Sequence, residues 1–305
     1  MKTNLLILLL FFITHFSFAQ SFNEVKKSAE QGDANAQYNL GVMYYDGEGT
    51  LTDKKQAFYW YKKSAEQGDA TAQFNLGGMY DNGDGTVKDY EQALYWYKKS
   101  AEQGNAKAQC NLGGNYLQGE GTVNDYKQAL YWYKKSAEQG DAKAQFNIGI
   151  IYEYGKGTLI DRKKALYWYK KSAEQGYATA QFNLGVMYYI GKGTLTNKKQ
   201  ALYWYKKSAE QGFVEAQFNL GEMYYIGEGT LTDKKKALYW LKKSAEQEYA
   251  KAQFNLGVMY LQGEGTVKDY KQGAFWIEKS SNNGCVRAKN AWRKFRLWQY
   301  LKLKN

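Results

Sequence analysis

The residues that most often carry out catalysis are scarce in this sequence of 305 residues. The single histidine, His15, lies in an apolar N-terminal segment, so the rest of the chain lacks the usual general base and the commonest metal ligand. Outside that segment, Ser-His-Asp and Cys-His arrangements are therefore excluded, and no Ser-x-x-Lys motif occurs. We expect no catalytic residue, no metal site and no cofactor.

Two glycine-rich patterns resemble known binding loops only superficially. Residues 81–85 read Asp-Asn-Gly-Asp-Gly, like the start of a calcium loop, but Gln92 stands where the acid of the twelfth position is required. The Gly-x-Gly-Thr segments lack the third glycine and the preceding strand of a nucleotide-binding loop. Because they recur at a fixed interval along the chain, we interpret them as turns.

The sequence consists mainly of one 36-residue repeat, which occurs seven times without a change in spacing. Each repeat contains Ala-Gln-x-Asn-Leu/Ile-Gly, with x usually aromatic, beginning at Ala36, Ala72, Ala108, Ala144, Ala180, Ala216 and Ala252. A tryptophan recurs in step at Trp60, Trp96, Trp132, Trp168, Trp204, Trp240 and Trp276. A period of this length indicates a solenoid, in which each repeat buries its apolar face only against its neighbours.

Each repeat is predicted to fold as two helices. The spacing of apolar residues predicts a first helix over about residues 34–46, which Gly47 and Gly49 end. A second helix begins at Asp53, whose carboxylate caps it while the Gln56 side chain reaches back, as in a capping box. The buried stripe of this second helix is predicted to comprise Ala57, Trp60, Tyr61, Ser64 and Ala65.

Glycine marks two positions of the repeat. Gly41 recurs in all seven repeats despite its cost inside a helix, which predicts a close helix crossing that a side chain would block. Gly68 and its equivalents suit the left-handed cap that ends the second helix. Glu248 replaces this glycine in one repeat, so we expect a looser turn or an altered stacking angle there.

Two side chains carry expectations about burial. Trp168, in the middle of the array, is expected to be buried, and its replacement by alanine to cost about 3–5 kcal/mol. Cys110 takes the aromatic position of its repeat, and we interpret it as a small apolar filler. It lies about five repeats from Cys285, so a disulfide within one stacked chain is not expected.

The termini differ from the repeats. Residues 1–19 have a positive start, a short apolar core and small residues before the end, which predicts a secretory signal peptide cleaved near Ala19. We therefore expect an exported protein, periplasmic or extracellular, whose mature chain has no transmembrane segment. The remainder is predicted to comprise an N-terminal capping half-repeat (20–32), seven repeats (33–284) and a basic C-terminal capping helix (285–305).

The formal net charge of the full sequence is +12. Part of this charge is periodic, because the pair Lys62 and Lys63 recurs in later repeats, and the i,i+4 spacing to Glu66 favours a solvated helix face. A basic protein can bind nucleic acid, but export argues against that partner. Anionic envelope surfaces or acidic proteins fit the charge better.

The pattern resembles the Sel-1-like repeat family, a relative of the tetratricopeptide repeat, over about residues 21–288. The positions that carry the resemblance in the first repeat are Ala36, Leu40, Gly41, Tyr44, Gly47, Gly49, Ala57, Trp60 and Gly68. The resemblance implies an all-α, right-handed α/α superhelical solenoid of about seven 36-residue helix-turn-helix repeats with terminal capping helices. It also implies an adaptor or scaffold in protein complexes, and bacterial exported members are similar in having a signal peptide.

By resemblance to tetratricopeptide arrays, the first helix of each repeat lines the concave face. The residues two before the motif leucine, one after the glycine, and four and five after the glycine are then expected to point into a groove. These positions predict the partner-binding residues Tyr38, Tyr45, Phe146, Tyr154, Phe182, Tyr189, Ile190, Phe218, Tyr225 and Ile226. An apolar groove rich in tyrosine suits an extended peptide or a helix. The alternative is that the phenylalanines of this set are buried between repeats.

Three hypotheses of function follow. The first is a non-catalytic scaffold or adaptor that binds a protein or peptide on the concave face. The second is a binder of envelope glycan or another anionic surface, with Arg293, Lys294 and Arg296 of the basic C-terminal segment in contact. The third is a β-lactam-binding hydrolase, implied by one branch of the family whose members carry a cysteine pair in each repeat; this chain has none of those pairs.

Overall fold

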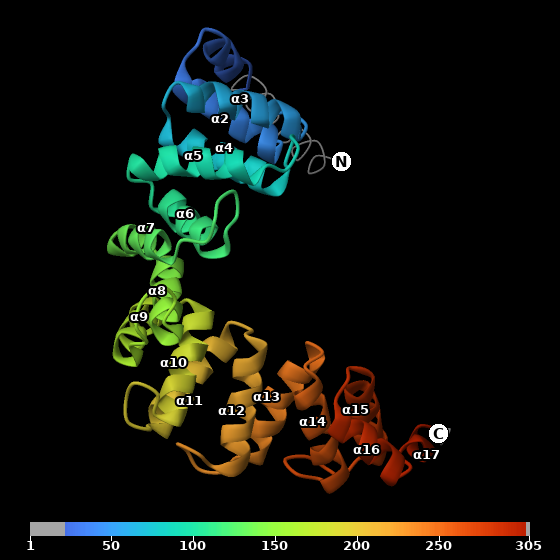
Figure 1. Ribbon diagram of the computed structural model, residues 1–305. Coiled ribbons are helices and arrows are strands. Elements are labelled where there is room, and N and C mark those ends of the chain that lie inside the picture. Colours follow the sequence, from blue (N-terminus) through green and yellow to red (C-terminus); the bar gives the residue numbers. More distant parts are fainter. Residues whose placement is uncertain (1–21, 303–305) are drawn as a thin grey trace, which may run out of the picture. The chain divides into compact units, whose positions relative to one another are not determined.

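The structure, a computed structural model, describes residues 22–302, and the regular elements of that range are helices without any strand. The expected signal peptide over residues 1–19 lies outside the described residues. The chain divides into two compact units (Figure 1). Among the described residues, the first unit comprises 22–148 with 156–158, and the second unit comprises 149–155 with 159–302.

Each repeat folds as two helices of 13 residues, which we call helix A and helix B. The A helices are α2 (Ala34–Asp46), α4 (Ala70–Asn82), α6 (Ala106–Gln118), α8 (Ala142–Tyr154), α10 (Ala178–Ile190), α12 (Val214–Ile226) and α14 (Ala250–Gln262). The B helices are α3 (Lys54–Glu66), α5 (Tyr90–Glu102), α7 (Tyr126–Glu138), α9 (Arg162–Glu174), α11 (Lys198–Glu210), α13 (Lys234–Glu246) and α15 (Tyr270–Asn282). The all-α repeat fold predicted from the period is confirmed.

Shorter helices flank the repeats. Residues 22–30 are helical ahead of α2, and α16 (Val286–Lys294) and α17 (Trp298–Lys302) follow α15. Within each unit, a B helix packs on the A helix of its own repeat and on the A helix of the next, as α3 does on α2 and α4.

Loop closure, rather than a complete capping box, starts helix B. The Asp53 carboxylate accepts hydrogen bonds from the backbone N–H groups of Lys55 and Gln56, both 3.0 Å long, as expected. The Asp53 N–H, however, donates to the carbonyl oxygen of Tyr44 over 2.8 Å, and the same bond recurs in every repeat. The predicted hydrogen bond between the Gln56 side chain and the Asp53 N–H is therefore wrong. The loop folds back onto helix A, so the Tyr44 carbonyl accepts the hydrogen bond from that N–H instead.

The turn at Glu248 keeps the geometry of the glycine turns, so the expectation of a looser turn is wrong. Glu248 adopts a left-handed conformation with φ 67°, as Gly68 does with φ 102°. Its N–H donates to Ala245 O over 3.0 Å, and the next N–H donates to Ser244 O over 3.3 Å. These hydrogen bonds offset the left-handed conformation, which costs a non-glycine residue about 1–2 kcal/mol.

The core clusters between repeats are built from one helix B and the helices of the next repeat, and the terminal helices complete the clusters at the two ends. In the first unit, Tyr61 of α3 packs with Leu76 and Met79 of α4 and with Trp96 of α5. The glycine of helix A makes room for the tyrosine of helix B: a methyl group on Gly77 would lie 2.7 Å from Cδ1 of Tyr97. The predicted steric role of this glycine is confirmed. The group that occupies the space is a tyrosine ring in the first five repeats, and Leu241 and Ile277 in the last two.

The tryptophans lie at the margin of these cores rather than at their centre. Trp60, Trp96, Trp132, Trp204 and Trp276 are 7–9% exposed, whereas Trp168 is only partly buried. The adjacent Tyr169 is fully buried. The expectation that Trp168 is buried is therefore wrong, because part of its ring is exposed to solvent. The ring of Tyr167 packs against it there, with the two ring centroids 5.3 Å apart.

A ladder of glutamine side chains joins consecutive repeats. The Gln73 amide donates to the carbonyl oxygen of Ala65 over 3.1 Å and accepts a hydrogen bond from the Gln103 amide over 2.8 Å. Gln103 also donates to Gly68 O over 2.9 Å. The bond to the preceding alanine recurs at Gln37, Gln109, Gln145, Gln181, Gln217 and Gln253. Each buried amide thus fixes the register between one repeat and the next.

Candidate functional site

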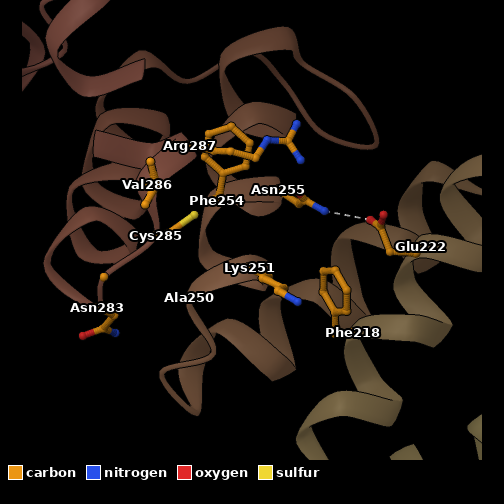
Figure 2. Close-up of a pocket in the computed structure, with 11 residues that line it drawn as sticks. Phe218, Glu222, Ala250, Lys251, Phe254, Asn255, Asn283, Cys285, Val286 and Arg287 are labelled. Atoms are coloured by element: carbon orange, nitrogen blue, oxygen red, sulfur yellow. Dashed lines mark hydrogen bonds between the residues drawn. The ribbon is translucent and has the colours of Figure 1, made fainter. Parts of the chain in front are cut away.

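In the second unit, side chains from α12, α14 and α16 surround a cavity of about 420 Å³ (Figure 2). An adjoining cavity of about 410 Å³ shares several of the same residues. We call the two together the second-unit groove, and define it by Phe218, Glu222, Tyr225, Ile226, Phe254, Asn255 and Arg287. The groove thus combines aromatic surface with the acid Glu222 and the base Arg287, and Lys251 adds a second basic side chain to its lining.

Charged and polar groups of the groove are held in place by contacts within it. The Asn255 amide donates a hydrogen bond to Glu222 Oε1 over 2.9 Å (Figure 2). The Arg287 guanidinium lies 5.0 Å from the centroid of the Phe254 ring. Burial raises the pKa of Glu222, while the hydrogen bond from Asn255 and the charge of Arg287 oppose that rise.

The Asn255–Glu222 bond depends on a change in the core beneath it. At four other boundaries the equivalent asparagine interacts with the hydroxyl of the buried helix B tyrosine and opposes the rise of its pKa, in the pairs Tyr61–Asn75, Tyr97–Asn111, Tyr169–Asn183 and Tyr205–Asn219. Leu241 occupies the tyrosine position before Asn255 and offers no hydroxyl. The amide of Asn255 therefore turns to Glu222, an acid at a position where the first repeat has Val42.

A second recurring arrangement, which we call the tyrosine clamp, joins helix A of one repeat to the loop of the next. The Tyr225 hydroxyl donates to Glu264 Oε2, and Lys234 Nζ lies over the Tyr225 ring and 3.6 Å from Glu264 Oε1. This bond to Glu264 raises the pKa of Tyr225 to about 12. Related arrangements occur at two other boundaries. Lys198 lies over the Tyr189 ring and 3.2 Å from Glu228 Oε2, and the Tyr45 hydroxyl donates to Asp84 Oδ2 beneath Lys54.

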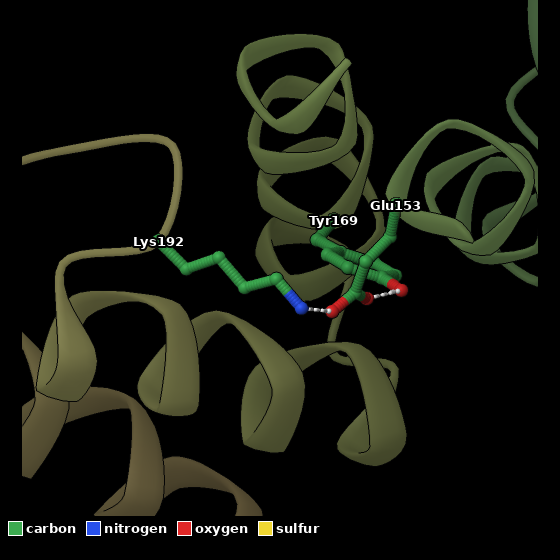
Figure 3. A network of polar contacts seen from close by, with 3 residues as sticks. All are labelled: Glu153, Tyr169 and Lys192. Carbon is green, nitrogen blue, oxygen red and sulfur yellow. Dashed lines mark hydrogen bonds and ion pairs between the residues drawn. The ribbon is translucent and has the colours of Figure 1, made fainter. Parts of the chain in front are cut away.

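One clamp is built with the charges exchanged (Figure 3). Helix A supplies the acid Glu153, and the loop of the next repeat supplies Lys192, whose Nζ lies 2.6 Å from Glu153 Oε1. The hydroxyl of the buried Tyr169 donates to Glu153 Oε2, also over 2.6 Å. The Glu153 side chain is only 11% exposed, so both of its oxygens are satisfied within the fold.

The structure places the predicted partner-binding residues in three different environments. Tyr154, Ile190 and Ile226 are 63, 57 and 54% exposed at the ends of their helices. The tyrosines of the clamps, Tyr45, Tyr189 and Tyr225, are half-buried and hold structural contacts. The remaining four residues occupy the aromatic position of helix A.

That aromatic position faces the neighbouring tyrosine of helix B. The ring centroids of Tyr38 and Tyr61 are 5.8 Å apart, as are those of Phe182 and Tyr205. Phe146 is buried, at 9% exposure, so its ring is not available to a partner and we remove it from the candidate site. Phe182 and Phe218 keep part of their surface accessible, and only Phe218 lines the second-unit groove.

The first unit has a smaller concavity at equivalent positions. Tyr38, Val42, Tyr45 and Phe74 line a cavity of about 350 Å³. Asp46, Asn82 and Asp84 also line it, so this cavity is more acidic than the second-unit groove and has no basic residue in its lining.

The basic residues named for a surface contact are accessible. Arg293, Lys294 and Arg296 are all exposed, and none of them joins an ion pair within residues 22–302. Over the same range, no His, Cys, Asp and Glu residues group in a way that could hold a metal ion. No helix in the described part of the chain combines the length and apolar character needed to cross a membrane.

Three of the residues predicted from the sequence, Phe218, Tyr225 and Ile226, line the second-unit groove, but the residues that give the groove its polarity were not predicted. Glu222 is visible as the single acid at a position otherwise held by small or aliphatic residues. Arg287 falls outside the repeats, and no signal in the sequence marks it. Asn255 belongs to the motif of every repeat, so only the loss of the tyrosine at Leu241 distinguishes it.

The Sel1 repeat model matches seven consecutive segments, residues 34–69, 70–105, 106–141, 142–177, 178–213, 214–249 and 250–285. The chain belongs to the Sel1 repeat family. Sel1 repeat proteins are generally non-catalytic scaffolds for protein interaction. The family that the motif suggested is thereby confirmed.

Solved Sel1 repeat structures resemble the chain over most of its length. A protective antigen of uropathogenic Escherichia coli with this fold is 35% identical, covers 90% of this chain and 68% of its own, and superposes with a TM-score of 0.70. A Sel1 repeat protein from Oxalobacter formigenes is 30% identical, with coverage of 92% and 81% and a TM-score of 0.75. No curated protein matches the sequence.

Proposed function

We propose that the protein is an exported scaffold that binds a segment of another protein in the second-unit groove. The observation that carries this proposal is the convergence of Phe218 and Phe254 with Glu222 and Arg287 on one concave surface. Partly accessible aromatic rings supply most of the affinity in such sites, while a few polar groups fix the orientation of the ligand. Export is proposed from the pattern of residues 1–19.

The groove favours a ligand segment with an apolar side chain next to polar or charged groups. The rings of Phe218 and Phe254 offer apolar contact, and Asn255 keeps the Glu222 carboxylate oriented. Ile226 extends the apolar surface at the end of α12 and is half exposed. A bound segment would cover these side chains without any change in the helices.

Site-specific photo-crosslinking in the native host tests this proposal. A photoreactive residue at position 226 should give adducts with a defined protein, and one at position 87 serves as the matched control. Val87 is 83% exposed in a loop of the first unit, so it reports adducts that exposure alone produces. Phe254→Ser should abolish the adducts at position 226 if the groove holds the ligand. The same adducts from both positions, or adducts insensitive to Phe254→Ser, would contradict the proposal.

A second candidate function is contact with an anionic envelope surface or glycan through the C-terminal segment. The exposure of Arg293, Lys294 and Arg296 without ion pairs among the described residues favours it. Binding of this kind should fall steeply as ionic strength rises, since exposed charges are screened over about 8 Å at physiological salt. Reversal of the three charges to glutamate should remove it, and binding unchanged by both treatments would argue against it.

A further inference from the structure

One exposed aliphatic side chain projects from the loop between helix A and helix B in every repeat. These side chains are 82–88% exposed, and they are Leu51, Val87, Val123, Leu159, Leu195, Leu231 and Val267. Single apolar residues on a surface are ordinary. A series repeated at the same point of each loop, and exposed to the same extent, instead forms an apolar row wherever the loops are contiguous.

The loops of the second unit are contiguous. A side chain at Gly193 would collide with the backbone carbonyl of Arg162, at the start of helix B in the preceding repeat. Gly229 stands in the same relation to Lys198, and Gly265 to Lys234. Each loop therefore packs directly on the first residue of helix B in the preceding repeat. The clamps of Tyr189 and Tyr225 tie the same loops together.

Unpaired cations accompany the leucines of the second unit. Arg162 and Lys163 follow Leu159, Lys199 follows Leu195, and Lys235 follows Leu231, in each case three or four residues further along the chain. All four are exposed in the first turn of helix B, and none joins an ion pair in the described structure. Ile160, 59% exposed, adds a second aliphatic side chain beside Leu159.

The equivalent loops of the first unit expose Leu51, Val87 and Val123 but carry no net positive charge. Residues 47–56 hold two acids and two lysines. Residues 83–92 hold three acids and one lysine, and residues 119–128 hold two acids and one lysine. Residues 191–200 of the second unit, in contrast, hold three lysines and no acid. The apolar row is thus combined with net positive charge only in the second unit.

We propose that the loop ridge of the second unit, formed by Leu159, Leu195 and Leu231 with Arg162, Lys163, Lys199 and Lys235, binds the surface of an anionic phospholipid bilayer. The leucines enter the boundary between headgroups and acyl chains, and the cations remain at the phosphates. Neither contribution suffices alone, because one aliphatic side chain inserts weakly and each surface cation adds little. Several of each on one contiguous ridge give reversible peripheral binding. This proposal does not depend on occupancy of the second-unit groove.

The ridge fits a lipid surface better than a protein pocket. Its leucines project almost fully into solvent rather than surrounding a cavity, and the residues that line the second-unit groove are different ones. A bilayer offers apolar depth beneath a layer of negative charge, which complements leucine tips flanked by cations.

Vesicle flotation with the full chain tests the proposal. Vesicles of phosphatidylglycerol and phosphatidylcholine in equal parts should carry the protein upward, and vesicles of phosphatidylcholine alone should not. The triple variant Leu159→Ser, Leu195→Ser, Leu231→Ser should lower the partition coefficient by at least about tenfold. The matched control is Leu51→Ser, Val87→Ser, Val123→Ser, which removes equally exposed side chains from the first unit and should retain binding. All variants share residues 1–21, so any contribution of that segment is the same in each.

Three outcomes would overturn the proposal. They are absence of binding to the anionic vesicles, equal loss of binding in both triple variants, and loss of binding only after charge reversal of Arg293, Lys294 and Arg296. The last outcome would assign the contact to the C-terminal segment. Because the leucines are exposed, circular dichroism and thermal unfolding should not distinguish the variants, which separates loss of binding from loss of fold. Photo-crosslinks from the groove should persist in all of them.

Discussion

The Asn255 amide lies 2.9 Å from the Glu222 carboxylate at the repeat boundary where Leu241 replaces a buried tyrosine. The two sequence changes are complementary, because the asparagine that loses a hydroxyl partner gains a carboxylate. As a result, the acid Glu222 is held in place beside the aromatic rings of the groove.

Replacing both residues by those usual in the other repeats should reveal this complementarity. Glu222→Val alone should cost about 1 kcal/mol, since it deprives Asn255 of its partner. Adding Leu241→Tyr should recover part of that loss by restoring the tyrosine–asparagine bond. Urea unfolding of the wild type, both single variants and the double variant gives the coupling energy, expected at about 0.5–3 kcal/mol for residues in contact. Strictly additive effects would show that the two positions are independent.

Replacing Glu222 or Glu228 by glutamine should change the free energy of unfolding at neutral pH in opposite directions. Burial raises the pKa of Glu222, so its ionised form is disfavoured in the folded state. Glu222→Gln should therefore increase the free energy of unfolding at pH 7, and the gain should vanish as pH falls below the usual carboxyl pKa of 4.5.

For Glu228 the sign is reversed. Tyr189 and Lys198 lower its pKa, so the ionised form contributes stability that is present at neutral pH and lost as pH falls through the lowered pKa. Glu228→Gln should accordingly destabilise the protein at pH 7 and have no effect in acid. Denaturant titrations of both variants from pH 7 to pH 3 test the two predictions. Changes in the free energy of unfolding that have the same sign for both variants at pH 7 would contradict them.

Two neighbouring glycines of α4 should differ when changed to alanine. A methyl group on Gly77 would lie 2.7 Å from the Tyr97 ring, so Gly77→Ala should cost about 1–3 kcal/mol through overpacking. A methyl group on Gly78 would meet only Tyr97 Oη at 3.7 Å, an ordinary contact. Gly78→Ala should instead stabilise by about 0.5–1 kcal/mol through helix propensity. Thermal unfolding of the two variants decides, and destabilisation by both would show that α4 has no spare room at either position.

The clamp with exchanged charges should be sensitive to the loss of one partner. Lys192→Met leaves the Glu153 carboxylate, 11% exposed, with the Tyr169 hydroxyl alone, and should cost about 1–3 kcal/mol. Glu153→Gln combined with Lys192→Met removes the unpaired charge and should be less harmful than Lys192→Met alone. Chemical unfolding measures both, and a double variant as unstable as the sum of its parts would contradict the clamp.

The two cysteines should differ sharply in reactivity. Cys110 is 3% exposed, and burial raises the pKa of its thiol to about 12, which suppresses the reactive thiolate. Cys285 is partly accessible and lines the cavity beside Phe218 and Phe254. Alkylation at pH 8 followed by mass spectrometry should modify Cys285 first and Cys110 only after denaturation. A ligand in the second-unit groove should slow the reaction of Cys285, and equal rates at both thiols would refute the difference in environment.

The helices could be predicted well from the sequence because the same spacing of apolar residues and glycines recurs in every repeat. Two of the wrong predictions concern backbone hydrogen bonds, and a third, the burial of Trp168, concerns a side chain. The Asp53 N–H bonds the Tyr44 carbonyl because the loop closes onto helix A, and Glu248 takes a left-handed conformation because two backbone hydrogen bonds hold its turn.

The candidate site was harder to predict than the fold. Periodicity located the positions of Phe218 and Ile226, but it gave no means to tell an open ring from a covered one such as Phe146. The arrangement of Glu222, Asn255 and Arg287 involves three helices, and its cause lies in the core at Leu241. No pattern within one repeat contains that information.

The glutamine ladder also bears on how a gene for this protein can change length. Every junction places the same amide against the same alanine carbonyl, so excision of residues 70–105 would bring Gln109 to Ala65 in place of Ala101. Recombination that removes or adds a whole 36-residue repeat would therefore preserve the glutamine–alanine hydrogen bond at the new boundary. Two boundaries differ, because the Glu222–Asn255 and Glu153–Lys192 contacts need particular residues in neighbouring repeats. Recombination at the first of them would remove the polar contact of the groove.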